Sequence, residues 1–76
     1  MKSEFFTSGC VERAYTYGKS GFIRDVFGKL YYFTEKSFTK RIKNLHEGDT
    51  VIFKPDKIKN EKTGDEQLFA AEVSFE

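Results

Sequence analysis

Aromatic residues are concentrated in residues 21–33, at a spacing that could bind flat ligands by stacking. This stretch predicts two short strands around a tight turn at Phe27 and Gly28, because glycine adopts the positive φ that such turns need. Alternate side chains of a strand face opposite sides, so an inward Ile23 places its neighbour outward. We expect three rings to face the solvent: Phe22, Tyr31 and Phe33. Nucleic-acid bases are common ligands of exposed rings, so the stretch predicts a base-stacking surface.

Basic residues gather in the same part of the chain. Residues 13–43 hold eight basic and two acidic residues, a net charge of +6, whereas the remainder carries −5 and the whole chain +1. The eight are Arg13, Lys19, Arg24, Lys29, Lys36, Lys40, Arg41 and Lys43. A segregated basic region can hold a phosphate backbone. The alternative is ordinary scatter on a charge-rich surface, but the overlap with the aromatic region favours nucleic acid.

Residue types that usually mark catalytic or metal sites are sparse. Gly18, Lys19 and Ser20 invite comparison with a phosphate-binding P-loop, but the first glycine of that motif is missing and no helical pattern follows. The single cysteine, Cys10, and the single histidine, His46, lie too far apart in sequence to indicate a zinc site. No nucleophile–base set or paired carboxylates can be assembled. We therefore expect no enzyme and no cofactor.

The hydrophobic pattern predicts one all-β domain over residues 1–76. Strands are expected over residues 8–17, 21–26, 29–34, 50–54 and 67–75, with Pro55 ending the fourth strand. Thr34 or Ser37 could cap a short helical turn in the basic loop 35–48, and residues 56–66 form a long hairpin loop. Five short strands without a long helix predict a small five-stranded antiparallel barrel. We assign these residues to its core: Val11, Ile23, Leu30, Tyr32, Val51, Phe53, Ala71 and Val73.

The number of cysteines and the hydropathy pattern indicate the cellular compartment. A lone cysteine fits a reducing, cytoplasmic environment. No apolar run approaches the roughly 20 residues of a membrane span, and the N-terminal Phe5 and Phe6 are too short a run for a signal core. We expect no membrane partner.

Five motifs in order resemble the cold-shock domain. Residues 8–11 resemble its opening Lys-Gly-x-Val strand, and residues 19–23 and 30–33 resemble its two nucleic-acid-binding motifs. Residues 45–53 resemble its Leu-x-Glu-Gly-x-x-Val-x-Phe segment, and residues 69–73 resemble Gln-Ala-x-x-Val. The resemblance covers residues 8–75. It implies an OB-type barrel that binds single-stranded RNA or DNA, with little sequence selectivity, as an RNA chaperone.

The departures from that family reduce its stacking platform. The tryptophan of the first strand falls at Arg13, and two further rings fall at Ser20 and Thr34, while the histidine of the second motif falls at Phe33. Arginine can also stack on a base and contact phosphate. Phe38, in the basic loop, could replace part of the lost platform.

The sequence therefore predicts a single-strand nucleic-acid interface. Its residues are Arg13, Lys19, Phe22, Arg24, Lys29, Tyr31, Phe33, Phe38, Lys40 and Arg41. The alternative is a protein-interaction module on the same barrel, with a protein partner or a weak homodimer, that has lost much of its nucleic-acid affinity. The two readings differ in salt dependence, because only nucleic-acid binding releases counterions.

Overall fold

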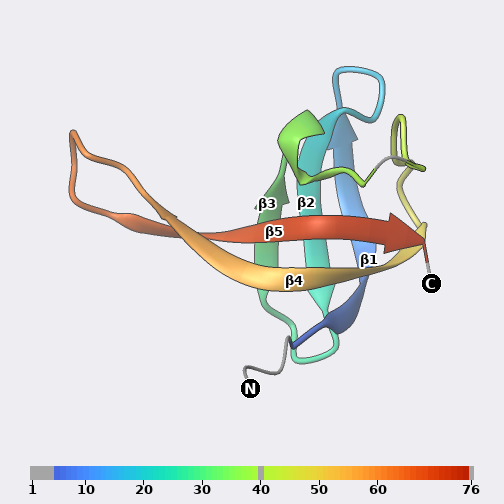
Figure 1. Cartoon of the computed structure of the whole chain (residues 1–76), viewed down its shortest axis with the longest axis horizontal. Coiled ribbons are helices and arrows are strands. Elements are labelled where there is room, and N and C mark those ends of the chain that lie inside the picture. Colours follow the sequence, from blue (N-terminus) through green and yellow to red (C-terminus); the bar gives the residue numbers. More distant parts are fainter. Residues whose placement is uncertain (1–4, 40, 76) are drawn as a thin grey trace.

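Five strands wrap into a closed barrel in the computed structural model, which describes residues 5–39 and 41–75. The elements are β1 (Thr7–Tyr15), β2 (Ser20–Asp25), β3 (Leu30–Phe33), the 3₁₀ turn η1 (Glu35–Ser37), β4 (Thr50–Lys59) and β5 (Glu66–Phe75). The strand order is β1-β2-β3-β5-β4, and β4 pairs with β1 to close the barrel (Figure 1). The pairings between these strands are antiparallel except that of β3 with β5. The predicted OB-type barrel is confirmed, with one parallel junction.

Bulges in two strands set which side chains face inward. In β1 the register shifts between Val11 and Arg13, so Val11 is buried whereas Arg13 is exposed opposite Phe22. In β5 the register shifts near Glu72, whose φ of 50° is left-handed, and both Ala70 and Val73 are buried. Each bulge adds one residue to its strand and so reverses the alternation beyond it.

The core confirms five of the predicted residues and corrects three. Val11, Ile23, Val51, Phe53 and Val73 are buried as predicted. Leu30 is exposed, and Tyr32 and Ala71 are only partly buried, so their assignment to the core is wrong. Their places are taken by residues that the sequence pattern placed outside or did not assign: Tyr31, Phe33, Ile42, Leu45 and Ala70.

The length of the β2–β3 turn explains the error on β3. Asp25 N–H donates to Lys29 O (2.9 Å), so three residues bridge the two strands rather than the two predicted. Ile23 therefore pairs with Tyr31, and Phe22 with Tyr32. Since directly opposite residues share a face, one extra turn residue moves every side chain of β3 to the other face.

The β4–β5 hairpin extends far beyond the barrel as a two-stranded arm (Figure 1). Pairing continues from Pro55 opposite Ala70 to Lys59 opposite Glu66, so the predictions that Pro55 ends the strand and that residues 56–66 form a loop are wrong. Proline is tolerated because β1 pairs with β4 only as far as Phe53. Beyond Phe53, the edge of β4 that pairs with β1 has no partner strand among the described residues. The N–H that proline lacks is therefore not needed for pairing on that edge.

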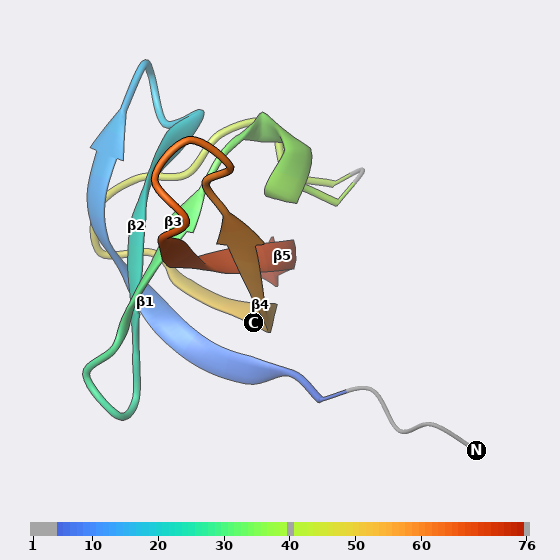
Figure 2. The same ribbon diagram turned by 90° about the vertical axis from the view of Figure 1, so that its left-hand side faces the viewer.

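The segment between β3 and β4 lies across one end of the barrel (Figure 2). Thr34 caps η1 as predicted: its Oγ1 accepts from Lys36 N–H (3.2 Å), and its own N–H donates to Ser37 Oγ (3.0 Å). Ile42 and Leu45 anchor the segment in the core. No helix in the described ranges has the length and apolar character that crossing a membrane requires.

Candidate nucleic-acid interface

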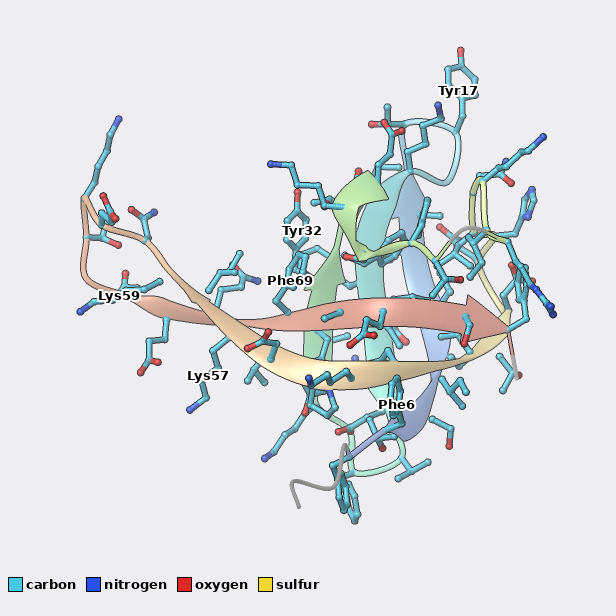
Figure 3. The ribbon with its side chains drawn as sticks, viewed as in Figure 1. Phe6, Tyr17, Tyr32, Lys57, Lys59 and Phe69 are labelled. Carbon is cyan, nitrogen blue, oxygen red and sulfur yellow. The ribbon has the colours of Figure 1, made fainter. Side chains whose placement is uncertain are left out.

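A row of side chains crosses the outer face of four neighbouring strands. Arg13 of β1 lies opposite Phe22 of β2, Phe22 opposite Tyr32 of β3, and Tyr32 opposite Phe69 of β5. The ring centroids of Phe22 and Tyr32 are 5.6 Å apart and those of Tyr32 and Phe69 are 6.4 Å apart. Figure 3 shows Tyr32 and Phe69 on the same side of the barrel. We call these four residues the outer row.

The three rings of the outer row are half-buried, and each is tilted by more than 50° against its neighbour. Tilted pairs of this kind are favourable arrangements that hold the rings in place. Each ring still reaches solvent, so the row presents apolar, aromatic surface without exposing whole side chains. A row of fixed rings is the geometry on which unpaired bases stack.

The sequence reasoning missed two rings of the outer row: it placed Tyr32 in the core, and it did not nominate Phe69. Simple alternation from Val73 places Ala71 and Phe69 inward, but the bulge at Glu72 exchanges Ala71 for Ala70 in the core. Phe69 then faces outward beside Tyr32. The available signal was an aromatic residue at the position where the cold-shock resemblance has glutamine, but its orientation depended on a bulge that the pattern does not reveal.

Two predicted stacking residues are buried instead. Tyr31 is 6% exposed and packs against Phe53 with ring centroids 4.9 Å apart. Phe33 is fully buried, and its ring lies 5.9 Å from that of Phe38. The prediction that both rings form a surface platform is wrong, because the β2–β3 turn sets the register described above. Phe22 keeps its predicted outward position.

The buried carboxylate of Asp25 fixes that turn. Its Oδ1 accepts hydrogen bonds from Phe27 N–H (2.9 Å) and Lys29 N–H (2.8 Å), while its carbonyl O accepts from Gly28 N–H (3.1 Å). Burial raises the pKa of the Tyr31 phenol, and the neighbouring Asp25 carboxylate adds to the effect by repelling the phenolate. Asp25 and Tyr31 are thus structural partners at the turn end of the β2–β3 hairpin.

Two of the three arginines nominated by the sequence, Arg13 and Arg24, have different surroundings. Arg24 donates from Nε and Nη2 to the two carboxylate oxygens of Glu12 (3.2 and 3.0 Å) and from Nη1 to Gly28 O (2.8 Å). The hydrogen bonds from Arg24 and its positive charge lower the pKa of the Glu12 carboxyl. Arg13 is exposed at the β1 end of the outer row and forms no ion pair within the described residues. Arg13 is therefore the freer of the two for a ligand.

The other nominated residues are dispersed. Lys19 forms an ion pair with Glu35 (3.8 Å), and Phe38 is partly buried against the core. The exposed Lys29 follows the β2–β3 turn, and Arg41 is exposed on the segment between β3 and β4. Lys40 lies outside the described residues.

A hollow of about 380 Å³ adjoins the outer row at the positions where the cold-shock resemblance expects two further rings. Its lining residues are Thr16, Lys19, Ser20, Thr34, Glu35 and Lys36. Ser20 continues β2 two residues before Phe22, and Thr34 follows Tyr32 by two, so the hollow extends the same face. Small side chains thus leave a concave surface with two lysines at its margin.

Comparison with protein-family models and with curated proteins finds no match for this chain. Within residues 5–39 and 41–75, no cluster of histidine, cysteine and acidic side chains could hold a metal ion.

Proposed function

We propose that the chain binds single-stranded RNA or DNA on the outer row, as a divergent cold-shock domain. The observation that supports this most strongly is the cross-strand alignment of Phe22, Tyr32 and Phe69, with Arg13 at its end. Bases of an unpaired strand stack on the three rings, and the Arg13 guanidinium contacts a base or a phosphate. The role is binding, without catalysis or a cofactor, and the lone Cys10 fits a cytoplasmic location.

Compared with the stacking surface of the cold-shock family, the outer row is shifted toward β5 and is not simply smaller. Rings are missing at Arg13, Ser20 and Thr34, whereas Phe69 adds a ring on β5. At about 1–3 kcal/mol per stacked base, the added ring offsets one of those losses. Stacking tolerates any base, so the bound strand is held with little sequence preference. Binding that competes with base pairing disfavours secondary structure in RNA, which is a chaperone activity that needs no ATP.

Protein binding is the second candidate function, and one observation favours it. Val26 and Phe27, in the β2–β3 turn, are 69% and 82% exposed. Exposed apolar side chains next to one another suit a protein partner or a second copy of the chain. Such an interface depends little on salt, whereas binding of a nucleic-acid backbone weakens steeply as salt rises.

Titration with a six-nucleotide oligo(U) or oligo(dT), followed by tyrosine fluorescence and amide shifts, tests the proposal. We expect saturation at low salt, weaker binding at moderate salt, and amide shifts centred on Phe22, Tyr32 and Phe69. No response to about 1 mM oligonucleotide at low salt, a concentration that detects binding of only about −4 kcal/mol, would overturn nucleic-acid binding. Self-association that Phe27→Ala abolishes would then support the protein-binding alternative.

A further inference from the structure

A groove of about 610 Å³ lies between the β1–β2 turn and the segment that follows η1. It is lined by Tyr17, Lys19, Glu35, Phe38, Thr39, Ile42, Lys43 and Asn44. Its size is within the range of pockets that bind small molecules in proteins. The outer row does not include any of these residues, so the groove is a separate feature of the surface.

The turn at the mouth of the groove holds an aromatic ring in the solvent. Thr16 and Tyr17 have φ values of 54° and 57°, a left-handed conformation that is costly for side chains of this kind. Tyr17 is 92% exposed, and Figure 3 shows its ring projecting from the tip of the turn. The strained turn exposes the Tyr17 ring instead of burying it, so the strain does not stabilise the core. Residues with strained backbone concentrate at ligand-binding sites.

Close contact between two loops fixes the groove. Leu45 N–H donates to Gly18 O (2.8 Å), and a Cβ on Gly18 would collide with the carbonyl oxygen of Leu45. Gly18 also has a left-handed φ of 81°, so only glycine permits this approach. The β1–β2 turn is therefore held against the segment that carries the rest of the groove.

The groove has an apolar floor and a hydroxyl group without a hydrogen-bond partner in the portion that the structure describes. Ile42 is buried, and Phe38 is supported by the Phe33 ring beneath it. Thr39 N–H donates to Val73 O (3.2 Å), which fixes its backbone. Thr39 Oγ1 is inaccessible to solvent and has no hydrogen-bond partner in the described part of the chain. An unpaired buried hydroxyl is unfavourable, and rotation about χ1 that brings it to a hydrogen-bonding ligand in the groove would relieve that cost.

The groove continues the surface of the outer row. The hollow at Ser20 and Thr34 adjoins the row, and it shares Lys19 and Glu35 with the groove. Lys43 adds a second cation to the groove lining. A strand that leaves the stacking rings can thus pass over the hollow and reach the groove, where its phosphates would contact Lys43 and would compete with Glu35 for Lys19.

We propose that this groove holds one nucleotide of the bound strand, the one that lies beyond the stacked bases. The proposal rests on the proposed function. Its base packs between the Tyr17 ring and the apolar surface of Phe38 and Ile42, and its phosphate pairs with Lys19 and Lys43. A change of the Thr39 χ1 rotamer turns Oγ1 toward the edge of the base.

Amide shifts on titration with uridine 5′-monophosphate, uridine and inorganic phosphate test the groove separately from the outer row. We expect the nucleotide to shift the amides of Tyr17, Thr39 and Asn44, uridine to shift them more weakly, and phosphate to affect Lys19 and Lys43 alone. Identical shifts from phosphate and nucleotide would reduce the groove to an anion site and overturn base binding there.

Two substitutions probe the groove without threatening the fold. Tyr17→Gly removes the ring and relieves the left-handed strain, so stability should be kept or raised while nucleotide affinity falls roughly tenfold. Thr39→Val removes the unpaired hydroxyl at nearly constant shape, so we expect stability to be kept or raised and affinity to fall severalfold. Unchanged nucleotide affinity in both variants contradicts the proposal.

Phe22→Ala is the matched control, because it alters the outer row and leaves the groove intact. It should weaken binding of a six-nucleotide oligo(U) but not of the mononucleotide. If Phe22→Ala weakens the oligomer while Tyr17→Gly and Thr39→Val leave it unchanged, the groove proposal fails and the outer row stands. If the mononucleotide binds the groove but no oligomer binds, the proposed function fails, and with it the role of the groove in holding part of a strand. If neither ligand binds, both proposals fail.

Discussion

Tyr31 and Tyr32 are adjacent in sequence and have opposite roles. Tyr31 faces the core, packs on Phe53 and lies beside the buried carboxylate of Asp25. Tyr32 faces outward between Phe22 and Phe69. The same side chain thus supports the barrel on one face and offers a stacking surface on the other. The residue type alone therefore does not reveal which tyrosine belongs to the outer row. The register of the β2–β3 hairpin decides it.

The largest effect that separates the two faces should be on stability. Phe33→Ala leaves a cavity in the core and should lower the free energy of unfolding by about 3–5 kcal/mol, a large share of the 5–15 kcal/mol typical of a domain. Phe69→Ala, on the half-buried outer row, should cost only about 1–1.5 kcal/mol, since less buried area is lost. Urea denaturation followed by circular dichroism measures both. Equal losses would contradict the assignment of faces.

Binding should show the opposite order. Tyr32→Ala should weaken oligo(U) binding by about 1–3 kcal/mol, the value of one stacked base. Tyr31→Phe keeps the buried ring and should leave affinity unchanged, so it is the control. Fluorescence or calorimetric titration at low salt measures both affinities. A loss of affinity in Tyr31→Phe that matches the loss in Tyr32→Ala would place the ligand on the wrong face of β3.

Alkaline pH should test the burial of Tyr31 on the inner face. The raised pKa of Tyr31 means that the unfolded chain releases this proton before the folded chain does. The stabilising contribution is complete below the ordinary pKa of about 10 and is lost as pH rises from there through the folded pKa. Unfolding free energies measured from about pH 8 to 11 should therefore fall less steeply in Tyr31→Phe than in the unsubstituted chain. Identical slopes would show that the phenol ionises equally in both states.

The smallest effect should distinguish Arg13 from Arg24. Arg13→Gln should weaken oligo(dT) binding severalfold and reduce the slope of log K against log salt by about 0.7, the value for one phosphate contact on a single strand. Arg24→Gln should leave that slope unchanged, because its guanidinium is engaged by Glu12 and Gly28. Titrations at three or four salt concentrations measure both slopes. A reduced slope in Arg24→Gln alone would reverse the roles of these residues.

The comparison of sequence and structure separates local from non-local information. The strand positions, the cap at Thr34 and the inward Ile23 and Phe53 follow from alternation and side-chain chemistry that act over a few residues. The outward position of Phe22 follows from the same local alternation. Half of the outer row, Arg13 and Phe22, was therefore nominated from sequence, whereas Tyr32 and Phe69 were not.

What the sequence determined by itself is a five-stranded all-β barrel with an aromatic and basic hairpin. What only the tertiary structure decided is the face of each ring. One residue in the turn held by Asp25 reverses β3, and one bulged residue at Glu72 reverses part of β5. Alternation has a period of two, so a single residue changes every orientation beyond it. The partner strands that fix those residues lie far away in sequence, and only the closed barrel brings Phe22, Tyr32 and Phe69 together.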